Sequence, residues 1–321
     1  MTQLVKFRPF LKSTIWGGEE ISSFKGIEID CENLGESWEL SGVPGCESVV
    51  AEGPDAGLTL TELVDKYKES LMGRRVYERY GNKFPLLIKF IDARDDLSLQ
   101  VHPNDELAMK RHNSFGKTEM WYILSTKENA RIHTGLTQEI DAEEYERRVK
   151  DHTLMDVVGS YESKPGDLFF LPAGRLHAIG TGNFLIEIQQ SSDVTYRVDD
   201  YDRRDKNGNT RELHTELAKD AIDYKYYPDC KSTPEKVGPN TELLVKCGYF
   251  LVNKEDVDGE REIANGADSF MGIVCIEGSG SITAGGVKTE VKQGDTMLLP
   301  AEAKGFEVDG KMTLMTVVIP E

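Results

Sequence analysis

The sequence lacks the features that mark several protein classes. Its 321 residues include five cysteines, an odd number with no Cys-x-x-Cys pair, so neither a disulfide framework nor a thiolate metal site is expected. No segment approaches the ~18 consecutive apolar residues that a membrane-spanning helix requires. Residues 1–9 also lack the sustained apolar region of a secretory signal. These absences predict a cytoplasmic protein with reduced thiols.

Basic residues are also fewer than acidic residues. The 38 lysines and arginines stand against 56 aspartates and glutamates, which gives a formal net charge of −18. A surface of this charge repels nucleic acid and anionic membranes, so we expect neither as a partner. A phosphorylated ligand would also be repelled at long range, so any site for one must supply its own cations.

Short β-type segments and frequent glycines, 30 in all, favour barrels or sandwiches over a helical bundle. One helix is predicted at about 59–79, where apolar residues recur at helical spacing and Thr59 with Glu62 resembles a capping box. The other predicted elements are helices at 105–112, about 141–158 and near 214–224, and strands at 84–91, 97–102, 120–124, 167–172 and 183–190.

The predicted domains are joined at a segment that contains three prolines. Residues 226–240 carry these prolines and one glycine, Gly238, which predicts a linker between an N-terminal domain, 1–225, and a C-terminal domain, 241–321. The C-terminal part has a pattern of strands and turns throughout. We expect the first domain to include inserted helices.

An internal repeat indicates duplication. Residues 166–173, Gly-Asp-Leu-Phe-Phe-Leu-Pro-Ala, match residues 294–301, Gly-Asp-Thr-Met-Leu-Leu-Pro-Ala. Two similar barrels explain this match better than chance does. His177, shortly after the first copy, corresponds to Gly305 after the second. The sequence therefore predicts one active barrel and one structural barrel without this ligand.

Four residues are candidate metal ligands. Gln100 and His102 lie two apart in an alternating segment, so their side chains share one strand face, although this pattern also suits a solvated face. Glu119 enters the next predicted strand and would by itself be an ordinary exposed carboxylate. His177 completes a Gly-x5-Pro-x-Gly-x2-His turn, which is the most specific of these signals. Two imidazoles, a carboxylate and an amide suit one zinc ion with an open position for substrate.

Charged residues near these ligands are candidates for catalysis. Lys117 is two residues before Glu119, so both side chains would point into the same cavity. Lys89, within an apolar run, either extends to solvent or faces a functional cavity. Arg197 either pairs with a nearby aspartate or binds phosphate through its planar guanidinium. Asp193 is either a helper acid or a turn residue.

Several of these motifs resemble known families. The Gly-x5-Pro-x-Gly-x2-His element resembles the second cupin motif. The segments that resemble type I phosphomannose isomerases are Ile15-Trp16-Gly17-Gly18, Gly35-Glu36-Ser37-Trp38-Glu39, Gln100-Val-His102-Pro-Asn-Asp, Lys117-Thr-Glu119 and Gly174-Arg-Leu-His177-Ala. The likeness extends over nearly the whole chain and matches the short bacterial form, which lacks a long helical insertion.

This resemblance implies a mainly β fold of two cupin, jelly-roll-like barrels with a few short helices. It implies that mannose 6-phosphate and fructose 6-phosphate are interconverted through an enediolate. Zinc would be bound by Gln100, His102, Glu119 and His177. Lys117 and Arg197 would serve catalysis and phosphate recognition, with Lys89 and Asp193 near the substrate. In one departure, Gly116 stands where many larger members have a histidine before the lysine.

Lys117 is the first candidate for the base, because a nearby dication favours a neutral amine over an ammonium. Two other functions stay open: another metallocupin, either a sugar isomerase or an oxygenase, and a non-catalytic sugar-binding cupin. Either a monomer or a homodimer is compatible with the sequence.

Overall fold

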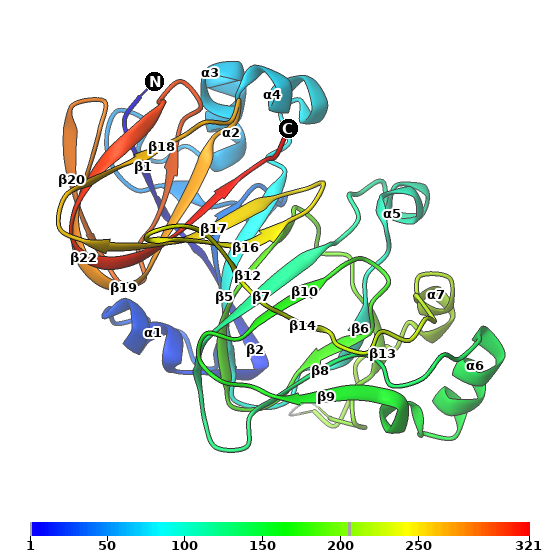
Figure 1. The fold of residues 1–321 in the computed structure, drawn as a ribbon. Helices are drawn as coiled ribbons and strands as arrows, with labels where there is room; N and C mark the ends of the chain where they lie inside the picture. The colour runs from blue at the N-terminus through cyan, green and yellow to red at the C-terminus, as the bar shows by residue number, and fades with distance from the viewer. Residues whose placement is uncertain (1, 205–206) are drawn as a thin grey trace.

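Three sheets hold most of the chain in the computed structural model, which describes residues 2–204 and 207–321 (Figure 1). Their named strands pair antiparallel throughout. A seven-stranded sheet has the order β14 (Lys231–Ser232), β10 (Leu168–Leu171), β7 (Glu119–Thr126), β12 (Asn183–Gln190), β5 (Leu86–Ala93), β2 (Phe10–Gly18) and β3 (Leu34–Ser41). A five-stranded sheet has the order β13 (Tyr196–Asp199), β6 (Leu99–Val101), β11 (His177–Ile179), β8 (Arg131–Leu136) and β9 (Val158–Glu162).

The third sheet has ten strands and contains the C-terminal part of the chain. Its order is β15 (Glu235–Gly238), β16 (Thr241–Lys246), β17 (Leu251–Asp258), β22 (Gly305–Val318), β19 (Met271–Ala284), β21 (Thr296–Leu299), β1 (Val5–Arg8) and β4 (Val49–Val50), with β18 (Arg261–Ala264) on β22 and β20 (Val287–Lys292) on β19. These sheets are of the mainly β, cupin-like kind that the sequence predicted. The predicted strand-and-turn pattern of 241–321 is confirmed.

The seven-stranded sheet is the middle layer, because both of its faces are buried. In β12, Ile186 and Ile188 pack into a core shared with Val274 and Val317 of the ten-stranded sheet. Leu185, on the opposite face, packs into a second core that includes residues near the five-stranded sheet. Burial on two faces explains the continuous apolar runs in β5 and β12, which a sheet with one solvated face would not show.

Short helices connect the strands. They are α1 (Glu20–Lys25), α2 (Leu60–Tyr67), α3 (Glu69–Met72), α4 (Arg74–Tyr80), α5 (Asp105–His112), α6 (Ala142–Lys150) and α7 (Thr215–Lys219), with a 3-10 turn at Leu154–Val157. The predicted capping box of Thr59 and Glu62 is present, and the Asn104 side chain caps α5 by accepting from Leu107 N–H. No helix among residues 2–204 and 207–321 is long and apolar enough to cross a bilayer.

The single helix predicted at 59–79 is wrong: three helices occupy this range. The helical conformation is interrupted at Lys68 and at Gly73, whose φ angles are 46° and 86°. A Cβ on Gly73 would lie 2.3 Å from the carbonyl oxygen of Asp268, so only glycine permits this approach. The Asp268 carboxylate in turn accepts the backbone N–H groups of Arg74 and Arg75. The predicted helices at 141–158 and 214–224 are likewise shorter than expected.

The internal repeat is visible as the same local structure twice. Gly166 and Gly294 both have positive φ, and each precedes a four-residue strand, β10 or β21. The second copy packs against α1: Lys25 Nζ donates to the Gly294 carbonyl at 2.7 Å and to both oxygens of Glu39 at 2.8 Å. A turn related to the one before β10 thus joins the ten-stranded sheet to β3.

The sheets also bear on the domain division. Strands β1 and β4, from the first 50 residues, pair within the ten-stranded sheet. Residues 226–240 contain β14, which pairs with β10, and β15, which pairs with β16. The segment therefore passes from one sheet to another, and the division into domains at this point stays a prediction.

Candidate active site

Three of the predicted ligands meet at the ends of three strands that belong to two sheets. His102 directly follows β6, Glu119 begins β7 and His177 begins β11. One potential ligand atom from each lies within 4.8 Å of the other two, and all three residues are buried. Gln100 stands opposite His177 in the pairing of β6 with β11. The turn before His177 places it as predicted, since Gly174, with φ 92°, donates its N–H to the carbonyl of His102.

The distances between these side chains are short. His102 Nε2 lies 3.1 Å from His177 Nε2, and Glu119 oxygens lie 3.4 Å from the former and 3.3 Å from the latter. The Gln100 amide is 3.3 Å from His177 Nε2, and a half-turn of this amide would bring its oxygen to the same place. Donor atoms of a four-coordinate zinc, at about 2.0–2.1 Å from the ion, lie about 3.3 Å apart. The cluster therefore has the dimensions of such a site.

Hydrogen bonds fix the two imidazoles so that their lone pairs face each other. His102 Nδ1 contacts the Val194 carbonyl at 3.0 Å, and His177 Nδ1 contacts the Arg175 carbonyl at 2.8 Å. Because a carbonyl only accepts, each Nδ1 must carry the proton and each Nε2 must present a lone pair. Both oxygens of Glu119 also lack hydrogen-bond partners among the described residues. Two lone pairs and a carboxylate converging in a buried space call for a cation.

Burial controls the protonation of these groups. Desolvation lowers the pKa of His177 to about 3 and, with the charge of Lys117, lowers that of His102 well below its usual value. Both rings are therefore neutral at physiological pH, as metal ligands must be. Desolvation, followed by the charge of Glu187, raises the pKa of Glu119 to about 7. A bound dication would remove this penalty, so the ligand set fits a divalent metal.

A row of alternating charges leads away from the cluster. Lys117 Nζ lies 3.2 Å from Glu119 and 4.0 Å from Glu187. Lys89 Nζ lies 2.9 Å from Glu187 and 3.0 Å from Glu36. The row ends at Lys12, which is 3.1 Å from Glu36 and the most exposed member. Tryptophans brace its carboxylates: Trp121 Nε1 donates to Glu187 at 2.6 Å, and Trp38 Nε1 donates to Glu36 at 2.8 Å.

The two buried lysines of this row have different surroundings. Burial disfavours the Lys89 ammonium, but attraction from Glu187 and Glu36 outweighs it and raises the pKa of Lys89. Burial is likewise outweighed at Glu36, where Lys89 and Lys12 lower the pKa to about 2. Lys89 is thus held as an ammonium by ion pairs with two carboxylates. Lys117 lies beside the candidate metal ligands instead.

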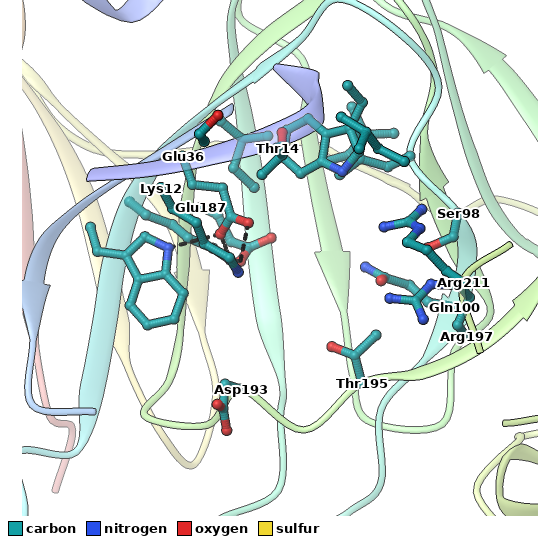
Figure 2. A pocket seen from close by; sticks show the side chains of 18 of the residues that line it. Lys12, Thr14, Glu36, Ser98, Gln100, Glu187, Asp193, Thr195, Arg197 and Arg211 are labelled. Atoms are coloured by element: carbon teal, nitrogen blue, oxygen red, sulfur yellow. Dashed lines mark hydrogen bonds and ion pairs between the residues drawn. The ribbon is translucent and has the colours of Figure 1, made fainter. Parts of the chain in front are cut away.

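A cavity of about 900 Å³ opens beside these residues. Gln100, Lys117, Lys89, Asp193 and Arg197 all line it. In Figure 2, the carboxylates of Glu36 and Glu187 lie on one side of the cavity, and the side chains of Gln100, Arg197 and Arg211 lie on the other. The structure therefore brings all eight predicted site residues to this cavity or to the cluster behind it, while their roles remain predictions.

Two arginines, Arg197 and Arg211, lie together at one end of the cavity (Figure 2), and Arg204 also lines it. Arg197 donates one guanidinium hydrogen bond to the Glu212 carbonyl at 2.8 Å, while its buried Nε has no partner among the described residues. Burial, and then the nearby charge of Arg211, lower the pKa of Arg197. The alternative that Arg197 pairs with a neighbouring aspartate is not observed in the described part of the chain. Asp200 instead accepts from Arg203 and Arg211.

Sequence reasoning missed several lining residues. Glu187 was not considered, although it interrupts an apolar run just as Lys89 does, and the two stand directly opposite in the pairing of β12 with β5. Two opposite charges in two buried strands are the signal that would have found it. Glu36 and Trp38 entered only through a family resemblance. Arg211 lies within a charged loop, residues 199–212, and pairs with Asp200, but the sequence did not single it out. Residues 205–206 of that loop lie outside the described residues.

Comparison with known proteins gives a consistent result over the whole chain. Residues 4–122 match the model of the phosphomannose isomerase type I catalytic domain, and residues 240–319 match that of the mannose-6-phosphate isomerase cupin domain. The mannose-6-phosphate isomerase ManA of Bacillus subtilis is 38% identical over 96% of this chain and 96% of its own. A mannose-6-phosphate isomerase of Streptococcus mutans is 35% identical over 94% of this chain and 93% of its own.

The fold agrees with these sequence matches. The crystal structure of a mannose 6-phosphate isomerase from Bacillus subtilis superposes with a TM-score of 0.88 at 36% sequence identity. The match covers 98% of this chain and 99% of that one. The likeness therefore includes all three sheets as well as the cavity.

Proposed function

Since the chain belongs to the type I mannose-6-phosphate isomerase family, we propose that its cavity interconverts mannose 6-phosphate and fructose 6-phosphate. The observation that carries this assignment is the buried His102–Glu119–His177 cluster beside Lys117, in a cavity whose far end carries arginines. A metal-dependent isomerase of sugar phosphates needs three things together: a metal, a base and a phosphate site. The chain is an isomerase, and the metal, base and phosphate residues are our proposal.

His102, Glu119, His177 and Gln100 are the proposed ligands of one zinc ion. Two imidazoles and a carboxylate suit a borderline metal such as zinc. Magnesium and calcium prefer sites with oxygen ligands only. When bound, zinc would polarise the sugar oxygens and offset negative charge that develops on them. The four residues come from β6, β7 and β11 and the residue after β6, so the strands hold the set rigidly.

Lys117 is the proposed base. Its amine would take the proton from C2 of the open-chain sugar and return it to C1, which converts aldehyde to ketone through an enediolate. Asp193, which lines the same cavity, is the proposed helper acid for transfer between the two oxygens. Lys89 is unsuited to the base role because two carboxylates hold it as an ammonium. We assign Lys89 to binding of the substrate and to orientation of Glu187.

Arg197 and Arg211 are proposed to bind the 6-phosphate. A guanidinium matches two phosphate oxygens at once, and the unpaired Nε of Arg197 is a free donor in this part of the cavity. Binding at this end would set the distance of C1 and C2 from the metal cluster. The positive charge of these arginines would also offset, close to the site, the long-range repulsion that a net charge of −18 exerts on a phosphorylated substrate.

A coupled assay with mannose 6-phosphate tests the function. Turnover is expected in the zinc-loaded protein, to be lost on chelation and restored by zinc. Absence of turnover in the zinc-loaded protein would favour a non-catalytic sugar-binding cupin. Oxygen consumption that depends on iron would instead favour a metallocupin oxygenase.

Replacing either arginine tests the phosphate site. Arg197→Gln and Arg211→Gln are each expected to raise the KM for mannose 6-phosphate by about 10- to 100-fold, since a hydrogen bond between charged groups contributes about 1.5–3 kcal/mol. The kcat value should change little, because neither residue contacts the reacting carbons. Steady-state kinetics check this, with the exposed Arg147→Gln as control. Unchanged KM in both variants would place the phosphate elsewhere.

A further inference from the structure

The segment that carries Lys117 has no regular secondary structure, yet the part of it around the lysine is buried. Residues 113–118 join α5 to β7, and Gly116, Lys117 and Thr118 are all shielded from solvent. No helix or strand ladder therefore sets the place of the lysine backbone. Its position depends on whatever hydrogen bonds the segment makes with other elements.

Three consecutive backbone N–H groups of this segment each donate to a different residue outside it. Gly116 donates to Asp105 Oδ1 at 2.8 Å, and Lys117 donates to the Pro103 carbonyl at 3.1 Å. Thr118 donates to Gln190 Oε1 at 2.9 Å. The segment is thus tied to the start of α5 on one side and to the end of β12 on the other. These bonds orient the Lys117 side chain toward the metal ligands.

The Asp105 carboxylate is the centre of this network. Its Oδ1 accepts from Gly116 and also from Gln190 Nε2 at 2.9 Å, and its Oδ2 accepts from the Tyr249 hydroxyl at 2.9 Å. Because Gln190 also binds Thr118, Asp105 holds the segment both directly and through this glutamine. Tyr249 lies in the turn between β16 and β17 of the ten-stranded sheet. The carboxylate therefore connects that sheet to the backbone beside Lys117.

Gly116 is shaped for this contact. A Cβ at this position would lie 2.5 Å from the Asp105 backbone nitrogen and 2.6 Å from the Asn104 carbonyl carbon. Any side chain would push the segment away from α5 and break the short bond to Oδ1. The glycine that departs from the histidine of many larger family members is thus required here by space. The network and the glycine belong to one arrangement.

We propose that Asp105 is a positioning residue for Lys117, and that Tyr249 is the means by which the ten-stranded sheet contributes to the active site. The proposal rests on the assignment of Lys117 as the base. A base displaced by about 1 Å loses about 100-fold in rate, so three ties on consecutive residues matter for turnover. A purely local role for Asp105, as an acidic residue in the first turn of α5, would leave catalysis unaffected.

Substitutions of Asp105, measured in the zinc-loaded full chain, separate these roles. Asp105→Ala is expected to lower kcat by about 10- to 100-fold with KM and zinc content unchanged. Asp105→Asn, which keeps an acceptor for Gly116 and a partner for Tyr249, should recover most of the rate. Tyr249→Phe should cause a smaller loss in the same direction. Glu106→Ala, an exposed acidic residue in the same first turn, is the matched control and should have wild-type kcat.

A double-mutant cycle with Lys117→Met tells where Asp105 acts. If Asp105 acts through Lys117, adding Asp105→Ala to Lys117→Met causes no further loss of kcat. An equal loss in both backgrounds, or wild-type kcat in Asp105→Ala, would overturn the positioning role and leave the proposed function standing. Near-wild-type turnover of Lys117→Met alone would overturn the base assignment itself, and the positioning role with it.

Discussion

Replacing Lys117 with methionine is expected to lower kcat for mannose 6-phosphate by about 10²- to 10⁴-fold, the usual contribution of a positioned base. Methionine keeps most of the side-chain volume and removes the amine, which lies 3.2 Å from Glu119. The ligand atoms themselves stay in place, so zinc content should be unchanged. Steady-state kinetics and metal analysis of the same preparation check both points.

The control for this substitution is Lys110→Met, on the exposed surface of α5. It should leave kcat and zinc content at wild-type values. Loss of zinc in Lys117→Met would mean that the lysine supports the ligands and does not act on substrate. Equal turnover of the variant and the wild type would remove Lys117 from the role of base.

Replacing His177 with alanine is expected to remove the metal and to lower kcat by at least about 10³-fold, since metal stabilisation of the transition state contributes several kcal/mol. His177 is held by the Arg175 carbonyl and faces both His102 and Glu119. The variant would keep only two strong ligands, His102 and Glu119, which is one fewer than catalytic zinc sites usually have, so its affinity for zinc should be low. Metal analysis after dialysis should find far less than one zinc per chain.

His152→Asn is the matched histidine control, because His152 is exposed and has the positive φ, 55°, that asparagine tolerates. It should bind zinc and turn over substrate as the wild type does. A His177→Ala protein that kept both zinc and activity would show that the catalytic metal site is elsewhere in the chain.

Much of the candidate metal site could be located from the sequence because its signals are local. The alternation of Gln100 and His102 depends only on strand geometry, and the glycines and proline before His177 specify the turn that delivers it. The structure confirms that the turn brings His177 to Gln100 and His102. The mainly β fold could be predicted for the same reason, since alternating segments and turn residues are recognised within a few residues of sequence.

Contacts between distant segments could not be predicted in this way. The pairing of β5 with β12 decides that Lys89 faces Glu187, across almost one hundred residues of chain. The carbonyl of Asp268 forces the break at Gly73 inside what the local pattern presents as one helix. A charge within an apolar run marks Lys89 and Glu187 as unusual, but no local pattern around Lys89 or Gly73 identifies the distant residue that it contacts.

The sequence by itself determined the types of the candidate ligands, their strand positions and the turn that presents His177, because backbone periodicity and turn chemistry act over a few residues. Only the tertiary structure decided that Asp105, Gln190 and Tyr249 converge on the segment before β7, and that Arg197 and Arg211 share one end of the cavity. Sheet register and the packing of layers fix these meetings. Such long-range geometry emerges when the cores form, and no local pattern encodes it.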